Sequence, residues 1–300
     1  MLDILTSYTF KVVFAGTLLL SISSALVGAL NLYKGQSLIG DAIGHSTFPG
    51  ITLAFILFQS RNPLILLLGA CISGGIAYYI IQKIKKTSII ELDASLAIVL
   101  SGFFGFGMVC KSYIQGNKSF TGTSQAGLEK YIFGQASYLL ESDVIIIATI
   151  TIICLFLMLA FYKELKLYLF DPEFAQVTGI PSRLVDMVIL ILTLLVISAG
   201  IKSVGFILIS SFLIIPTISA QQWSHKFGHV LVLACIFSAI STFIGNYLSS
   251  SADGLATGPT IIVVSCIIAF FSMLFGKRSF IYHKLRPAIK CQEKIKNNLS

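Results

Sequence analysis

The sequence predicts an all-α protein that crosses a membrane repeatedly, as a polytopic bundle of eight or nine transmembrane helices. Of its 300 residues, 56% are hydrophobic and 11% are charged, whereas soluble domains usually carry about 25% charged residues. The mean hydropathy is +0.90. Several stretches lack Asp, Glu, Lys and Arg over the roughly 17 to 25 residues that a helix needs to cross a bilayer core. These stretches are apolar on every face, which argues against a membrane β-barrel.

Nine candidate spans follow one another within residues 1–276, which we expect to form a single transmembrane domain. They are residues 9–31, 37–58, 63–82, 92–110, 143–162, 184–201, 203–221, 229–248 and 258–276. The connection at 201–203 is very short for a turn between two full spans, so one of the two spans beside it is a candidate half-helix. Helices break at membrane depth only where protein or a water-filled cavity covers the freed backbone, so such a break would indicate a transport path.

The basic residues between the spans predict the orientation of the chain. They all fall on one side if the spans alternate: Lys83, Lys85, Lys86, Lys163, Lys166 and Lys226, followed by the basic tail of residues 277–300. Cytoplasmic loops carry an excess of Lys and Arg. We therefore expect this side, with the C-terminus, in the cytoplasm of a cell (inner) membrane, and the N-terminus outside. Most of the net charge of +8 comes from the tail beside the last span, so we expect a lipid membrane and no nucleic acid as its partner.

The cytoplasmic loop of residues 163–183 predicts a short helix outside the membrane. Asp171 suits the N-cap, Pro172 the first helical position, Glu173 the first turn, and Gly179 the end of the helix. Such a helix could lie on the membrane surface, or it could dock into a groove of a partner protein.

The outer loop of residues 111–142 is the other long connection, and it is rich in Gly, Ser, Thr and Lys. It contains a less polar piece at 131–134, which could dip into the membrane.

Two ionisable residues stand inside the otherwise apolar second span. Asp41 and His45 are four residues apart, so a helix would place both side chains on one face, with about 5 to 6 Å between their β-carbons. An ionisable residue in a spanning helix costs about 2.5 to 3.5 kcal/mol on insertion scales, which makes a function the default explanation. The alternative is that Asp41 lies at the membrane edge as an N-terminal helix residue and that His45 only hydrogen-bonds to a neighbouring span.

Neighbouring residues favour an ion site over that alternative. Gly40 and Gly44 form a small-xxx-small pair that allows another backbone to approach closely. Pro49 has no N–H, so in a continuous helix the carbonyl of His45 would lose its partner and become available to a hydrated cation. A carboxylate, an imidazole and a carbonyl suit a hard or borderline divalent ion. Since Zn²⁺ usually takes four ligands and Mn²⁺ about six, a second copy of the subunit could supply the rest.

Other ionisable residues are weaker candidates. His225 and His229 repeat the four-residue spacing, but they flank Lys226 in a cytoplasmic turn, and we interpret them as interfacial. Asp93 and Asp186 enter their spans from basic loops and are expected to be helix-start acids. The six cysteines show no CxxC spacing and indicate neither a disulfide framework nor a thiolate site.

The missing motifs limit the function classes. The sequence contains no GxxxxGK[ST] phosphate loop, so any ATP must be hydrolysed by another chain. It contains no HExxH motif either, which argues against an intramembrane metalloenzyme. We therefore expect a transport subunit and not an enzyme, with no permanently bound cofactor. A secondary transporter or channel for divalent cations remains the alternative, because it could use the same acid and histidine for proton coupling.

Residues 38–50 (LIGDAIGHSTFPG) resemble the GDALSHAVLPG signature of the metal-ion permeases of ABC importers, the ABC-3 family for zinc, manganese and iron. Further blocks agree with the family: 92–97 (LDASLA), 131–134 (YIFG), 171–179 (DPEFAQVTG), 204–210 (VGFILIS), 214–216 (IIP) and 257–259 (TGP). The resemblance covers about residues 10–276. Gly44 stands where the family usually has Ser, and the basic tail is longer than typical.

The resemblance implies a permease similar to those of the vitamin B12-type (type II) importers, which moves Mn, Zn or Fe ions into the cytoplasm by alternating access. It implies three partners: an ATP-binding subunit, an extracytoplasmic metal-binding protein, and a second permease copy or paralogue. It also implies that Asp41 and His45 contact the transported ion. The segment at 171–180 would be the coupling helix that docks on the ATPase, with Asp171, Pro172, Glu173, Phe174, Ala175 and Gly179.

Overall fold

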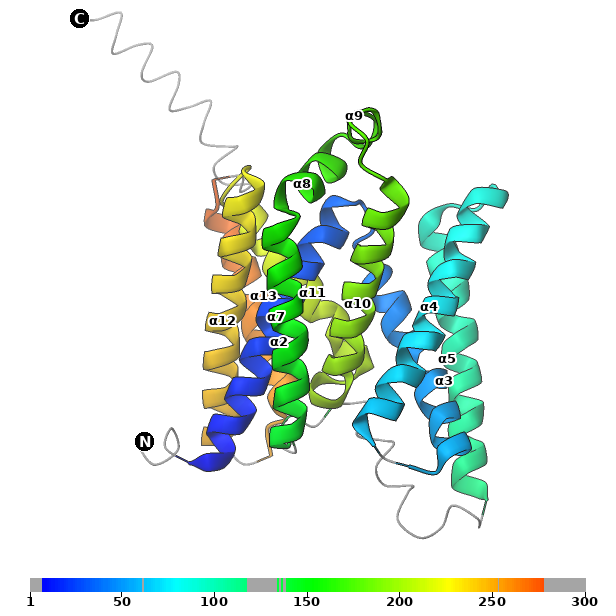
Figure 1. The fold of residues 1–300 in the computed structure, drawn as a ribbon. Helices are drawn as coiled ribbons and strands as arrows, with labels where there is room; N and C mark the ends of the chain where they lie inside the picture. The colour runs from blue at the N-terminus through cyan, green and yellow to red at the C-terminus, as the bar shows by residue number, and fades with distance from the viewer. Residues whose placement is uncertain are drawn as a thin grey trace, which may run out of the picture.

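A computed structural model describes residues 7–60, 62–117, 134, 136, 139–252 and 254–277, with the side chains of residues 202, 206 and 207 excluded. Every regular element within these ranges is a helix, which confirms the all-α prediction (Figure 1). The helices are α2 (Tyr8–Tyr33), α3 (Ile39–Phe58), α4 (Pro63–Thr87), α5 (Leu92–Gly116), α7 (Glu141–Ala160), α8 (Tyr162–Phe170), α9 (Pro172–Val177), α10 (Ser182–Val204), α11 (Phe206–Gln221), α12 (Phe227–Ser251) and α13 (Thr257–Phe275). Eight helices in this part of the chain are long and apolar enough to cross a membrane.

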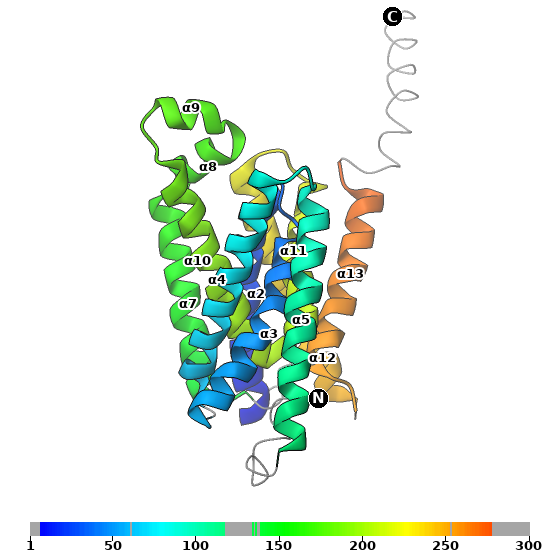
Figure 2. The ribbon, with the colours of Figure 1, turned by 90° about the vertical axis from the view of Figure 1, so that its right-hand side faces the viewer.

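The long helices run alternately up and down, so that α9 and the start of α2 lie at opposite ends of the bundle (Figure 1). The ends of α4 and α13, helix α8 and the start of α12 all lie at the α9 end (Figures 1 and 2). These segments carry the basic residues used to predict the orientation, together with Lys277, the first residue of the tail. The other tail residues, 278–300, lie outside the described part.

The ninth apolar segment is the short helix α11, with 16 residues. The sequence correctly predicted a half-helix here, but it placed the turn wrongly. Helix α10 continues through the predicted connection to Val204, and the chain reverses at Gly205. Gly205 has φ 85° and ψ 158°, a conformation that is open essentially to glycine alone. The turn therefore lies at Gly205, whose backbone conformation requires glycine, and not at the predicted connection of residues 201–203.

Gly134 of the outer loop lies against this turn. Gly134 has φ 69°, and an added Cβ at this position would overlap the backbone of Val204 and Gly205. The rest of the segment predicted to dip into the membrane, residues 131–133, lies outside the described part.

Helix α2 is the centre of the bundle, because four other helices form hydrogen bonds with it. These bonds join Thr151 of α7 to the carbonyl of Leu19 (3.1 Å), Ser238 of α12 to the carbonyl of Ser21 (2.9 Å), Thr217 of α11 to the carbonyl of Ala25 (3.4 Å), Asn246 of α12 to Thr17 (2.9 Å), and Asn31 to Thr193 of α10 (2.9 Å). Since lipid offers no hydrogen bonds, polar side chains of this kind hold helices together from within the bundle.

Helices α3, α4 and α5 lie side by side as a group at one edge of the molecule, on the right in Figure 1 and facing the viewer in Figure 2. Their backbones approach closely where Gly50 of α3 crosses Gly69 of α4, because a Cβ on either residue would overlap the other backbone. The hydroxyl of Ser73 on α4 also donates to the carbonyl of Ser46 on α3 at 2.6 Å. Small residues thus allow α3 and α4 to pack at short range.

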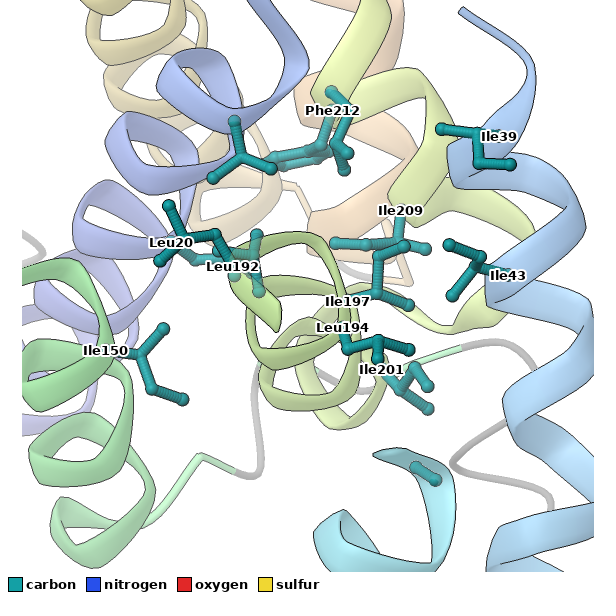
Figure 3. Close-up of a cluster of buried hydrophobic side chains, with 14 of the residues drawn as sticks. Leu20, Ile39, Ile43, Ile150, Leu192, Leu194, Ile197, Ile201, Ile209 and Phe212 are labelled. Atoms are coloured by element: carbon teal, nitrogen blue, oxygen red, sulfur yellow. The ribbon is translucent and has the colours of Figure 1, made fainter. Parts of the chain in front are cut away.

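A buried apolar cluster joins this group to the rest of the bundle (Figure 3). Ile39 and Ile43 of α3 lie opposite Ile209 of α11, and Ile197 of α10 lies beside them (Figure 3). These side chains are 0% or 1% exposed. Helix α3 is therefore connected to the core mainly through α10 and the short helix α11.

Replacing Gly28 with Ala should lower the thermal stability of the purified protein. A Cβ on Gly28 of α2 would overlap the carbonyl oxygen of Leu213 on α11, and such overpacking costs about 1 to 3 kcal/mol. Gly102→Ala is the matched control, because an added Cβ at Gly102 meets nothing within 4 Å. Thermal melts in detergent should give a lower midpoint for the Gly28 variant only, and equal midpoints would contradict the close approach of α2 and α11.

Candidate functional site

The first two turns of α3 position the polar pair that the sequence singled out. Asp41 lies in the first turn of α3 and His45 in the next. The Nε2 atom of His45 is 3.6 Å from Oδ1 of Asp41, and the two side chains are 17% and 40% exposed, respectively. The four-residue spacing therefore places both groups on one face, as predicted. Their role as ligands stays a prediction.

The distance between the two groups is longer than a direct hydrogen bond. A hydrogen bond from N–H to O is about 2.7 to 3.2 Å long, so the two atoms are not bonded to each other. Two ligands about 2.1 Å from one ion, at an angle of about 90° to 110°, stand roughly 3.0 to 3.4 Å apart. A small closure of the observed 3.6 Å would reach this range.

The helix itself also stabilises the charge on Asp41. An acid in the first turn of a helix is favoured by the helix dipole, typically by about 0.3 to 1 kcal/mol. This agrees with the location that the membrane-edge alternative assigns to Asp41. The position of Asp41 alone therefore does not require an ion, and the argument for a site depends on its pairing with His45.

Aromatic and small residues from other helices shape the surroundings of His45. Its ring meets the ring of Phe104 on α5 edge-on, with 5.2 Å between the centroids and 89° between the planes. Gly40 faces α11, where an added Cβ would be 3.4 Å from Leu213. Gly44 is buried in α3, and Pro49 lies inside a helix that continues to Phe58. Gly40 is therefore in ordinary contact with α11, and the close approach predicted for Gly40 and Gly44 stays a prediction.

The described part of one chain supplies too few ligand side chains for a closed metal site. No group of three or more His, Cys, Asp and Glu residues placed to hold a metal occurs within the described residues. His225 and His229 are both exposed, beside and inside the start of α12. Asp93 lies in the first turn of α5, as predicted. Any full coordination shell around Asp41 and His45 would need ligands from outside the described chain.

Helix α9 has the ends that the sequence predicted. The side chain of Asp171 accepts a hydrogen bond from the backbone N–H of Phe174 at 3.0 Å, and Pro172 is the first helical residue. At the other end Gly179 has φ 86°, and the N–H of Ile180 donates to the carbonyl of Ala175 at 2.9 Å. These contacts satisfy backbone groups that a short helix would otherwise leave unpaired.

Helix α9 projects beyond the ends of the spanning helices (Figures 1 and 2), and its exposed side chains form an apolar surface there. Phe174 is 52% exposed and Val177 is 84% exposed. Glu173 is also exposed, whereas Ala175 is buried. Large apolar side chains exposed outside the membrane-spanning segments indicate an interaction surface.

Some features of this region were not predicted from the sequence. The loop of residues 163–183 contains a second helix, α8, which leads into α9. The prediction that Asp186 is a helix-start acid was wrong, because Asp186 lies beyond the first turn of α10 and pairs with Lys34 at 2.7 Å. Asp143, which is 5% exposed, caps α7 by accepting a hydrogen bond from the N–H of Leu140 at 2.9 Å. An acid at the start of the predicted span 143–162 was the signal for that cap.

Removing the cap of α9 should loosen this helix without changing the bundle. Asp171→Ala loses the hydrogen bond to the N–H of Phe174, at a typical cost of about 1 kcal/mol, whereas Asp171→Asn keeps an acceptor there. Hydrogen exchange of the α9 amides should be faster in the alanine variant than in the asparagine variant. Equal exchange in the two would mean that the cap does not hold the helix.

Comparison with known proteins places the chain among membrane transport subunits. The ABC 3 transport family matches residues 6–276. The chain is 35% identical over 285 residues to the zinc transport system membrane protein TroC of Treponema pallidum, with 95% of each chain covered. It is 38% identical over 262 residues to the manganese transport system membrane protein MntC of Bacillus subtilis, covering 87% of this chain and 60% of that longer protein. It is 32% identical over 263 residues to the chelated iron transport system membrane protein YfeD of Yersinia pestis, covering 88% of this chain and 82% of YfeD.

The structures of two transporters have the same fold. PsaBC from Streptococcus pneumoniae, solved in complex with a Fab, matches with a TM-score of 0.82 and 26% identity, covering 94% of this chain and 96% of that one. A putative metal-chelate type ABC transporter in an inward-facing conformation matches with a TM-score of 0.66 and 16% identity, which shows the fold alone. Eight spanning helices and relatives that are membrane subunits make this a multi-pass membrane protein. The chain belongs to the ABC 3 transport family and is a membrane permease subunit, as its resemblance in sequence implied.

Proposed function

We propose that this chain forms the ion pathway of an ATP-driven importer of manganese, zinc or iron ions, with Asp41 and His45 as ion ligands. The observation that carries the proposal is the pairing of a carboxylate and an imidazole, 3.6 Å apart, on one face of a spanning helix. An acid and a base inside a membrane are expensive and usually mark an ion path. The names of relatives include zinc, manganese and chelated iron transport, which supports the same range of metals.

The pathway lies between two permease chains, either two copies of this chain or this chain and a paralogue. Each chain contributes one carboxylate and one imidazole, so a two-fold axis beside Asp41 would bring four ligand side chains together. The 40% exposure of Asp41 leaves the carboxylate accessible from that side. A site assembled from two chains would open when the chains separate. Such a site suits a transported ion, which binds transiently.

The α9 end of the bundle faces the cytoplasm, with the C-terminal tail, because the basic residues gather at that end. We take residues 1–276 as the permease domain and 277–300 as its cytoplasmic tail. ATP hydrolysis lies on a separate subunit, and α9 docks on that subunit through Phe174. An extracytoplasmic metal-binding protein delivers the ion at the opposite end. ATP binding and hydrolysis then move α9 and change the side to which the Asp41 and His45 site is open.

Asp41→Ala and His45→Ala should each abolish metal uptake while leaving the protein in the membrane. Loss of a group that only orients a metal ligand lowers metal affinity or activity about 10- to 100-fold. Loss of a ligand itself should lower uptake by at least as much. Uptake of Mn, Zn and Fe is measured together in cells that lack the native gene and express each variant.

Asp93→Ala and His229→Ala are matched controls, because both residues are exposed and lie outside the site. Normal uptake by the Asp41 and His45 variants, at normal protein levels, would overturn the assignment of the ligands.

Replacing Glu173 and Phe174 together with Ala should release the ATP-binding subunit during co-purification. Phe174 presents a large apolar surface, and truncation of a central interface aromatic often costs about 2 kcal/mol or more, roughly 30-fold in affinity. Phe58→Ala is the control, because Phe58 is also exposed, at 64%, but ends α3 at the opposite end of the bundle from α9. Undiminished co-purification of the double variant would favour the alternative of a secondary transporter or channel.

A further inference from the structure

Three polar side chains from three helices meet near α9. The ammonium of Lys34, at the end of α2, is 2.7 Å from Oδ1 of Asp186 on α10. The hydroxyl of Tyr168 on α8 donates to the same carboxylate oxygen at 2.6 Å. Helix α4 adds Tyr78, whose hydroxyl is 3.5 Å from Nζ of Lys34. One carboxylate therefore links α2, α8 and α10, and Lys34 extends the contact to α4.

These contacts are partly shielded from water. The Lys34 side chain is 11% exposed and Tyr168 is 9% exposed, whereas the Asp186 side chain is 40% exposed. Burial raises the pKa of Tyr168, and the hydrogen bond to Asp186 and its charge raise it further, so the hydroxyl stays protonated and can donate. Hydrogen bonds to ionised groups are about twice as strong as neutral ones. Removing one partner would leave a shielded charge without its counter-charge.

The position of the cluster connects α9 to α3. Tyr168 lies in the last turn of α8, just before Asp171, the N-cap of α9. Lys34 ends α2, and the turn that follows it leads directly into α3. That turn is tightly held, because Gly35 has φ 72° and the N–H of Gln36 donates to the carbonyl of Asn31 at 2.9 Å. A displacement of α8 would thus reach the start of α3 through two direct contacts and one short turn.

A cavity of about 260 Å³ lies beside these residues, and Pro172 of α9 lines it together with Lys34, Tyr168 and Asp186. Gln36 and Gln82 line the same cavity. The space gives the segment around Tyr168 and Pro172 room to move on this side, while Leu165 of α8 and Ala175 of α9 pack in the core.

We propose that Lys34, Tyr168 and Asp186 form a coupling latch, which transmits movement of α9 to the α2–α3 turn and so to the helix that carries Asp41 and His45. The latch residues touch no ion and act as positioning residues. The inference rests on the proposed docking role of α9 and adds the contacts through which that docking changes the ion site. A purely structural ion pair would affect stability alone, whereas the latch also sets how much transport each ATP drives.

Tyr168→Phe tests the first step, because it removes the hydroxyl and keeps the buried ring. In the purified full chain, hydrogen exchange of the α8 and α9 amides should become about tenfold faster or more, as expected for loss of a bond to a charged group. Tyr162→Phe on the same helix is the control, because the ring of Tyr162 stacks on Phe227 at 5.8 Å and is retained. Unchanged exchange in the Tyr168 variant would overturn the latch.

The second step is tested in proteoliposomes that contain the permease with its ATP-binding subunit, loaded from one side with Mn²⁺. Tyr168→Phe and Asp186→Asn should each lower the Mn²⁺ taken up per ATP hydrolysed, by about 2- to 30-fold, while the ATP-binding subunit stays bound. The variant that combines Tyr168→Phe with Asp186→Asn should take up as much Mn²⁺ per ATP as Asp186→Asn alone, because both changes break the same contact. Uptake per ATP equal to that of the unmodified protein in both single variants would overturn the latch.

The two proposals fail in different ways. If the variant at Glu173 and Phe174 keeps the ATP-binding subunit bound, the docking role of α9 fails, whatever the Tyr168 variant does. If that docking holds and the Tyr168 variant loosens α8 and α9 without changing uptake per ATP, only the latch fails.

Discussion

The bundle depends on polar side chains that satisfy one another where lipid offers no partners. Helix α2 receives hydrogen bonds from Thr151, Ser238 and Thr217 of three neighbouring helices, and its own Asn31 bonds to Thr193 of a fourth. Each such hydrogen bond stabilises helix association in membranes by only about 0.6 to 2 kcal/mol. Together they fix the rotation and depth of the helices around α2, so the remaining helices pack on a defined surface.

The group formed by α3, α4 and α5 is bound differently, and this difference matters for transport. Its own contacts are close because glycines such as Gly50 and Gly69 let the backbones approach. Its contact with the rest of the bundle passes largely through α10 and the short α11, where Ile43 and Ile209 meet. The helix that carries the polar pair therefore lies at a boundary between two packed groups. Relative movement of these groups would change access to Asp41 while leaving the packing inside each of them intact.

The sequence predicted those features that depend on local chemistry. Apolar runs identified the spans, four-residue spacing placed Asp41 and His45 on one face, and cap residues defined α9. The turn predicted at 201–203 was misplaced, because the backbone reversal requires a glycine and Gly205 provides it. Helix α8 was missed because its lysines broke the apolar pattern. The pairing of Lys34 with Asp186 joins positions far apart in the chain and becomes visible only after the helices are arranged. The family resemblance, by contrast, was carried by whole motifs and was confirmed by the relatives.

In the proposed transporter, two permease chains share one ion through Asp41 and His45. The most direct measurement is electron paramagnetic resonance of Mn²⁺ bound to the purified transporter, combined with the metal content per chain. The account predicts one Mn²⁺ for every two permease chains, with couplings to imidazole nitrogen that disappear in His45→Ala. One Mn²⁺ for each chain, or nitrogen couplings that persist in that variant, would contradict it.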